Sequence, residues 1–152
     1  MKTRLRFEAD PSLEQIEILV RAPQRDTQVE AIIKRISNPV PETITVFDRL
    51  DNIRMILTDD IVSAYVEGKQ VHILTESGNY YIKNTIRYLE AQLDPSLFVR
   101  ISRYEIVNIS KVTSFDFTLA GTLRLELSGG METWASRRSI PAIRKLLKGR
   151  EE

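Results

Sequence analysis

Two arginines interrupt an apolar frame in residues 98–108, where the sequence reads Phe-Val-Arg-Ile-Ser-Arg-Tyr-Glu-Ile-Val-Asn. Arginine can neutralise a phosphate, and its forked donors can also reach a guanine edge. Buried neighbours would hold Arg100 and Arg103 at fixed positions for such contacts. The alternative is an ordinary half-buried strand and turn whose arginines are solvated.

Other polar and cationic side chains stand at two further predicted bends. Lys69 and Gln70 follow Gly68, where a turn is expected after a strand over 61–67. Arg137 and Arg138 come directly before the last predicted helix, whose first N–H groups favour anions. Side chains of this kind on separate loops suit a polyanionic partner rather than a small substrate.

Residues suited to catalysis are sparse. His72 is the only histidine and lies in an apolar run, so a structural or exposed position is expected. The chain has no cysteine and lacks the usual zinc-protease, serine-hydrolase and phosphate-loop motifs. Asp59 and Asp60 are predicted to form the turn before the 61–67 strand, and as adjacent strand residues they would point to opposite faces and share no site. We therefore expect no enzyme, no metal, no cofactor and no small-molecule substrate.

The charges of the chain are unevenly distributed. Residues 1–97 contain 12 Lys or Arg against 15 Asp or Glu, whereas residues 98–150 contain 10 against 4. This asymmetry favours a polyanion as partner of the second part. No apolar run approaches the ~20 residues of a membrane helix, and the start has no secretory apolar core. A soluble, cytoplasmic protein is the expectation.

The first 42 residues predict a small strand–strand–helix extension. Alternation with period two predicts strands over 1–8 and 16–20. Thr27 and Glu30 resemble a capping box, and the apolar spacing predicts a helix that ends at Asn38-Pro39. The unit is too short for a phosphoacceptor receiver domain. It could pack on the rest of the chain, support a dimer or contact a regulator.

Residues 43–152 predict a mainly β domain of short antiparallel strands. Period-two segments separated by turn residues recur throughout this part. The expected strands cover 43–48, 52–57, 61–67, 71–76, 79–83, 97–102, 111–117, 122–127 and 131–135. A helix is expected from Asn84 or Thr85 to Leu93, and a second one after Ser139.

Four segments of this domain, in order, resemble the LytTR family of DNA-binding domains. Residues 98–108 are similar to its F-x-R-I-x-R-x-x-x-V-N signature, and residues 60–67 to its D-I-x-Y-I-E strand. Residues 88–93 are similar to its L-x-x-L-E-x-x-L helix, and residues 135–138 to its closing S-R. The resemblance covers roughly residues 50 to 148.

The resemblance implies stacked antiparallel sheets with short helices, and a transcriptional regulator without a receiver domain. Such a protein reads double-stranded DNA through loops, as a homodimer on repeated sites, and can be restrained by a regulatory membrane protein. Carried over by position, the DNA-binding residues are Lys69, Gln70, Arg100, Ser102, Arg103, Arg137 and Arg138. The alternative function is a protein-interaction β module that does not bind DNA.

Overall fold

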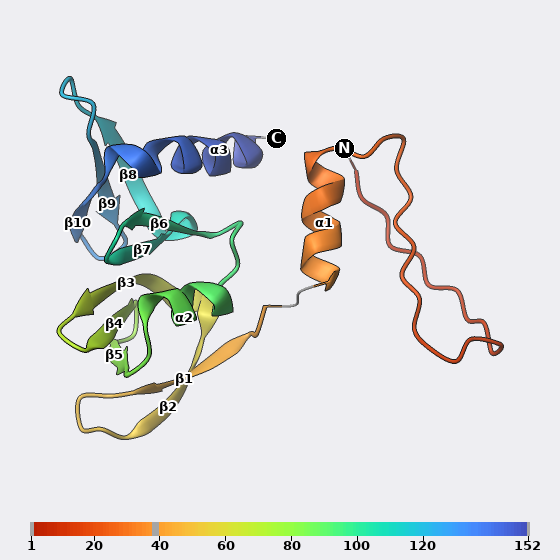
Figure 1. Cartoon of the computed structure of the whole chain (residues 1–152), viewed down its shortest axis with the longest axis horizontal. Helices are drawn as coiled ribbons and strands as arrows, with labels where there is room; N and C mark the ends of the chain where they lie inside the picture. The colour runs from red at the N-terminus through yellow and green to blue at the C-terminus, as the bar shows by residue number, and fades with distance from the viewer. Residues whose placement is uncertain (1, 38–39, 152) are drawn as a thin grey trace. The chain divides into compact units, whose positions relative to one another are not determined.

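The computed structural model describes residues 2–37 and 40–151 (Figure 1). The chain divides into two compact units, residues 1–39 and residues 40–152. No helix among the described residues is long and apolar enough to cross a membrane.

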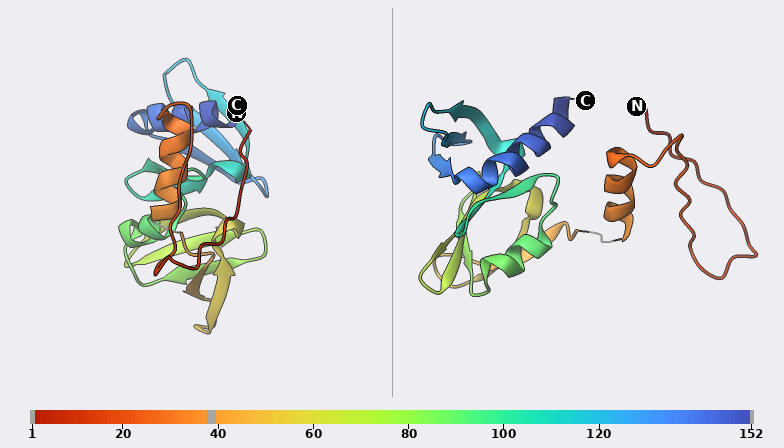
Figure 2. Two further views of the ribbon diagram at one scale, coloured as in Figure 1. Left: turned by 90° about the vertical axis from the view of Figure 1, so that its right-hand side faces the viewer. Right: turned by 45° about the horizontal axis from the view of Figure 1, so that its top comes forward.

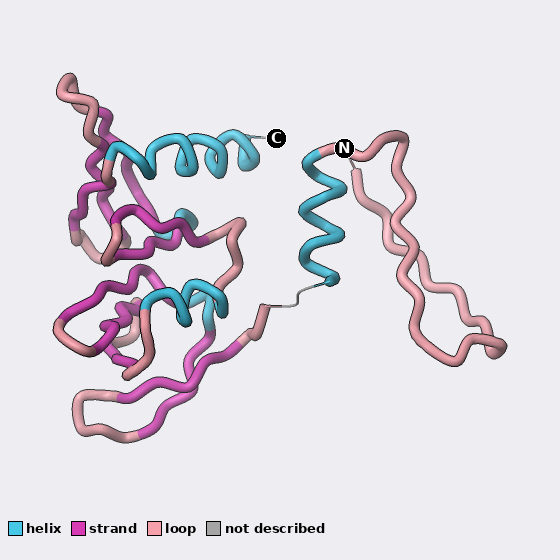
Figure 3. Tube along the Cα trace, in the orientation of Figure 1, coloured by secondary structure: helices cyan, strands magenta, loops and turns pink. Residues whose placement is uncertain are grey.

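In the described part of the first unit, residues 2–37, a long loop precedes one helix. Residues 2–26 form no strand, so the strands predicted over 1–8 and 16–20 are not present (Figure 3); Met1 lies outside the described residues. Leu5, Phe7 and Ile16 are 97%, 89% and 92% exposed. An isolated hairpin is marginal unless a further strand or helix covers its apolar face. The sequence alternates with a period of two, but within the described residues of this unit no strand or helix buries these side chains.

Helix α1 (Thr27–Ser37) begins as predicted but with a different cap. The carboxylate of Asp26 accepts the backbone N–H of Val29 at 2.9 Å, which satisfies one of the free donors of the first turn. Glu30 instead pairs with Arg25. The predicted stop at Asn38-Pro39 lies outside the described residues.

The second unit is built on a sheet of seven strands in the order β2-β1-β5-β4-β3-β7-β6. All of its pairings are antiparallel. The strands are β1 (Thr43–Phe47), β2 (Ile53–Leu57), β3 (Ile61–Glu67), β4 (Gln70–Thr75), β5 (Asn79–Ile82), β6 (Phe98–Ser102) and β7 (Glu105–Asn108).

A smaller sheet of three antiparallel strands follows, in the order β10-β9-β8. Its strands are β8 (Val112–Phe117), β9 (Leu123–Leu127) and β10 (Glu132–Ala135). Helix α2 (Ile86–Gln92) lies beside the large sheet and helix α3 (Ile140–Glu151) beside the small one (Figures 1 and 2). This architecture confirms the predicted stacked antiparallel sheets with short helices.

Two hydrophobic cores lie on either side of the β3–β7–β6 part of the large sheet. Ile106 of β7 belongs to the core with α2, whereas its neighbour Val107 belongs to the core with the small sheet and α3. Phe98 and Val99 of β6 divide in the same way. Because both faces are buried, β7 shows no polar alternation, and it is the one strand of this sheet that the sequence pattern did not predict.

Asn108 closes β7 with a fully buried amide. Its Nδ2 donates to the carbonyl of Ile61 at 2.8 Å, and its Oδ1 accepts the backbone N–H of Ser110 at 2.9 Å and that residue's hydroxyl at 2.6 Å. The side chain thus ties β3 to the turn after β7. The asparagine of the 98–108 segment therefore has a structural role.

Candidate nucleic-acid interface

The register of the large sheet brings three polar segments to the same end. Glu67 of β3 pairs with Gln70 of β4, so the 68–69 turn lies at that end. Tyr65 of β3 pairs with Glu105 of β7, which places the 103–104 turn beside the 68–69 turn. Val71 of β4 pairs with the last residue of β5, so the 83–85 segment leaves the sheet there as well.

The 68–69 turn and the 103–104 turn line one hollow of about 300 Å³. The backbone N–H of Val66 donates to the carbonyl of Tyr104 at 2.8 Å and holds the two turns together. Lys69 and Arg103 are exposed at its rim, and Tyr104 is 58% exposed. The first two loops predicted to bind DNA therefore form one continuous surface.

The sequence pattern did not point to the 83–85 segment as part of the candidate site, although this segment lines the same hollow. Lys83 and Asn84 line the hollow and are exposed, adding one cation and one amide. Thr85 instead caps α2, since its hydroxyl accepts the backbone N–H of Tyr88 at 3.1 Å. A lysine followed by an amide between a strand and a helix was the available signal, but only the strand register places the pair beside Arg103.

The 136–139 segment adjoins the 103–104 turn through β6. The backbone N–H of Ser136 donates to the carbonyl of Ile101 at 2.7 Å, two residues before Arg103. Arg137 donates from Nη2 to the carbonyl of Ala120 at 2.9 Å, which tethers it to the β8–β9 loop. The side chain of Arg138 is exposed and has no ion-pair or hydrogen-bond partner in the part of the chain that the structure describes. Of the two adjacent arginines, Arg138 is therefore the one available to a ligand.

The cations that line the hollow differ from Arg124 of strand β9 in whether a carboxylate neutralises them. Arg124 pairs with Asp116 at 2.7 Å and with Glu132 at 2.6 Å, which raises its pKa, chiefly through the hydrogen bond to Asp116. By contrast, Lys69 and Arg103 pair with no carboxylate among the described residues. Their charge is not neutralised locally and is open to an external anion.

Arg100 and Ser102, both half-buried, hold the 103–104 turn through hydrogen bonds within the protein. Arg100 donates to the carbonyl of Arg103 at 2.9 Å and to the carboxylate of Glu90 at 3.3 Å. The hydroxyl of Ser102 accepts the backbone N–H of Tyr104 at 3.2 Å. These bonds favour a positioning role for both residues over the DNA contact that the resemblance implies.

Glu105, directly after the turn, faces the small sheet. Its carboxylate accepts the hydroxyl of Thr133 at 2.7 Å. Burial raises the pKa of Glu105 above its ordinary value, and the hydrogen bond from Thr133 offsets only part of this effect. The negative charge beside Arg103 is thus half-buried and directed toward β10.

Glu105→Gln is expected to raise the free energy of unfolding at neutral pH. Because folding raises the pKa, the folded state holds the proton more tightly, and wild-type stability falls as the pH rises above the ordinary value of 4.5. Glutamine keeps the bond to Thr133 without a charge. Urea unfolding between pH 4 and 8 should show the difference shrinking toward acid pH. A constant difference, or one matched by the exposed Glu42→Gln control, would contradict this account.

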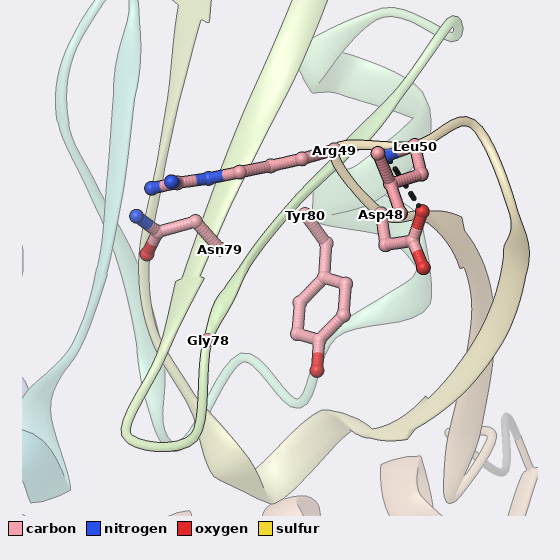
Figure 4. A pocket seen from close by; sticks show the side chains of 6 residues that line it. All are labelled: Asp48, Arg49, Leu50, Gly78, Asn79 and Tyr80. Atoms are coloured by element: carbon pink, nitrogen blue, oxygen red, sulfur yellow. Dashed lines mark hydrogen bonds between the residues drawn. The ribbon is translucent and has the colours of Figure 1, made fainter.

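A second hollow, of about 410 Å³, lies at the opposite end of β5, as the pairing of Phe47 with Tyr81 requires. In Figure 4, Arg49 extends beside Asn79 while Tyr80 points away from both. Asp48 is occupied by its own turn, accepting the backbone N–H groups of Leu50 and Asn52 at 2.9 Å each. The polar groups do not converge on a shared ligand position.

His72 is part of the scaffold, as expected. Its ring stacks on Tyr65 with centroids 5.3 Å apart, and its Nε2 lies 3.5 Å from the carboxylate of Glu67. Across the described residues, no group of three or more His, Cys, Asp or Glu side chains could hold a metal ion.

Comparisons with known proteins agree on one family. Residues 51–148 match the model of the LytTr DNA-binding domain. Uncharacterized HTH-type transcriptional regulators of two Staphylococcus aureus strains, NCTC 8325 and bovine RF122, are each 30% identical over 148 residues, covering 97% of this chain and 98% of theirs. A solved LytTr DNA-binding domain from Bacillus cereus aligns with a TM-score of 0.65 at 20% identity, covering 70% of this chain and 97% of its own.

Proposed function

Because this chain belongs to the LytTR family of DNA-binding domains, we propose that it regulates transcription by reading double-stranded DNA with side chains at one end of its large sheet. The observation that carries this proposal is the shared hollow of the 68–69 turn, the 103–104 turn and the 83–85 segment. Its cations are exposed and unpaired with carboxylates among the described residues, while scaffold cations such as Arg124 are neutralised.

We assign the proposed DNA contacts to the side chains that are exposed and not engaged within the protein. Arg103 and Arg138 are the candidates for base edges, because arginine can donate twice to guanine. Lys69 and Lys83 are candidates for phosphates, and Gln70 and Asn84 are amides that could meet an adenine edge. Arg100, Ser102 and Arg137 position the loops. Reading from loops on a rigid scaffold is a common use of such segments.

The helices of the second unit supply no helix-turn-helix within residues 40–151, although the staphylococcal relatives carry that term in their names. Strands β6 to β10 separate α2 from α3. Helix α2 also buries Ile86 and Leu89 in the first core, together with the following Leu93. The bends, rather than a recognition helix, are therefore the proposed reading elements.

The proposal predicts binding that depends steeply on salt. Fluorescence anisotropy with the duplex upstream of the protein's own gene should give a linear plot of log Kd against log salt concentration, with a slope of roughly 0.9 per neutralised phosphate. Lys69→Ala should reduce the slope by about one without changing sequence preference. Equal affinity for a shuffled duplex, or binding that salt does not weaken, would contradict sequence-specific reading.

We further propose that the first unit, residues 1–39, contacts a protein partner, for which a regulatory membrane protein is a candidate. Leu5, Phe7 and Ile16 are almost fully exposed, and α1 has no buried residue. The staphylococcal relatives align over 97% of this chain, so they share most of this extension. Co-purification from detergent extracts tests the proposal: Leu5→Ser with Phe7→Ser should release the partner while leaving DNA affinity unchanged.

A further inference from the structure

The outer edge of β2 is an open sheet edge. No strand or helix of residues 40–151 lies beyond β2, which ends the strand order of the large sheet (Figure 1). The opposite edge is different, because the backbone N–H of Ser136 bonds to the carbonyl of Ile101 in β6. Open edges invite pairing with another strand unless lysine, proline or a bulge blocks them. The sequence of β2, Ile-Arg-Met-Ile-Leu, contains neither lysine nor proline.

The hydrogen-bond register determines which residues of β2 face outward. The ladder with β1 is flanked by two bonds, from the N–H of Asp48 to the carbonyl of Asn52 and from the N–H of Thr58 to the carbonyl of Glu42. Inward-bonding residues alternate along an antiparallel strand, so every second residue from Asn52 to Thr58 bonds to β1. The N–H and C=O groups of Ile53, Met55 and Leu57 therefore point away from the sheet.

The same three residues carry an exposed apolar stripe. Ile53, Met55 and Leu57 are 67%, 70% and 51% exposed. Side chains at alternating positions lie on one face of a strand, so these three form a row. The opposite face of the β1–β2 hairpin packs Val46, Ile44 and Ile56 against the first core. The row is thus an apolar surface held rigidly by a packed scaffold.

The strand is complementary to a second copy of itself. In an antiparallel pair centred on Met55, Met55 faces Met55 and Ile53 faces Leu57, so all outward N–H and C=O groups of the three residues find partners. The only charged side chain of the strand, Arg54, stands opposite Ile56 in this register. It is also neutralised by Asp48, whose Oδ2 lies 3.0 Å from its Nε. No unpaired like charges meet across the two-fold axis.

We propose that two copies of this protein associate through antiparallel pairing of their β2 strands, centred on Met55, into one continuous sheet. The contact is isologous, as in most closed dimers. A single strand from each copy buries less than a standard interface, so the dimer is expected to be weak and concentration-dependent. This inference adds an interface to the proposed DNA-binding regulator but does not require DNA.

Single cysteine variants of the full chain test the pairing and its register, since the protein has no cysteine of its own. Residues facing each other in a hydrogen-bonded pair have Cα atoms about 5.5 Å apart, within disulfide range. Met55→Cys should therefore form a covalent dimer under copper-phenanthroline oxidation. Ile53→Cys should not, because two copies of residue 53 would lie about 15 Å apart, four residues along the strand and one strand spacing across. A mixture of Ile53→Cys and Leu57→Cys should cross-link.

Leu119→Cys, at a fully exposed residue of the β8–β9 loop, measures cross-linking by random collision. In addition, Met55→Lys should weaken self-association at least tenfold in sedimentation equilibrium, whereas Leu119→Lys should leave it unchanged. The pairing is wrong if Met55→Cys cross-links no better than Leu119→Cys, or if Ile53→Cys alone cross-links as readily as Met55→Cys. Because these measurements contain no DNA, their failure would leave the proposed DNA reading standing, and the reverse also holds.

Discussion

Replacing Arg103 or Arg138 by alanine is expected to weaken binding to the cognate duplex by about 1–3 kcal/mol each, or roughly 5- to 150-fold in Kd. Both side chains are exposed, and neither is paired with a carboxylate in the part of the chain that the structure describes. Discrimination against a shuffled duplex should fall as well, because a lost base contact costs more on the right sequence than on a wrong one. Fluorescence anisotropy at fixed salt measures both quantities.

The control for this loss is Arg49→Ala. Arg49 is also an exposed arginine in a turn, but it belongs to the second hollow at the other end of the sheet (Figure 4). The substitution removes the same charge, so it reports the nonspecific electrostatic contribution alone. If Arg49→Ala weakens binding as much as Arg103→Ala does, net charge rather than the 103–104 turn determines the affinity.

Arg100→Gln tests whether Arg100 positions the 103–104 turn or contacts the DNA itself. Arg100 bonds to Glu90 and to the carbonyl of Arg103 within the protein. Its loss should loosen the 103–104 turn and weaken DNA binding, but the slope of log Kd against log salt should stay that of the wild type, because no phosphate contact is removed. A reduced slope would place Arg100 on the DNA instead.

Asn108→Leu is expected to lower the free energy of unfolding by about 2–4 kcal/mol, the largest stability effect that we anticipate from a single side chain. The asparagine is fully buried, and leucine would leave the carbonyl of Ile61 and the N–H of Ser110 without their partner. Buried polar groups that lose their hydrogen bonds keep the cost of desolvation. Urea unfolding followed by circular dichroism gives the value.

Asn79→Ala serves as the matched control, because Asn79 is an asparagine in a strand of the same sheet but has an exposed side chain. Its effect should stay within about 0.5 kcal/mol, as is usual at the surface. An Asn108→Leu variant that is as stable as Asn79→Ala would show that the buried bonds to Ile61 and Ser110 contribute little.

Burial on both faces removes the polar alternation of a strand, although β3 and β6 were predicted despite contributing to both cores. Strand β9 buries Leu123, Leu125 and Leu127 and leaves the residues between them partly exposed, so its period of two is visible in the sequence. Strand β7 divides Ile106 and Val107 between two cores and shows no such period. In the extension the alternation is clear in the sequence, but the described residues 2–26 form no strand.

The candidate site was predictable only where local sequence carries the signal. The turn at Gly68 and the signature arginines pointed to two of the loops directly. Lys83 was missed because its place beside Arg103 follows from the pairing of β4 with β5 and of β3 with β7, which no local pattern encodes. The internal bond between Arg100 and Glu90 likewise joins β6 to α2 across ten residues. Contacts between segments far apart in the sequence therefore determine which cations are free to bind a ligand.

The most direct test of DNA reading from one end of the sheet is an NMR titration of the labelled protein with its upstream duplex. Backbone amide signals of residues 68–70, 83–85, 102–104 and 136–139 should shift together and saturate at a common stoichiometry. Signals of the 48–50 turn should not move. Shifts confined to that turn or to α1, with the four segments unaffected, would contradict the account.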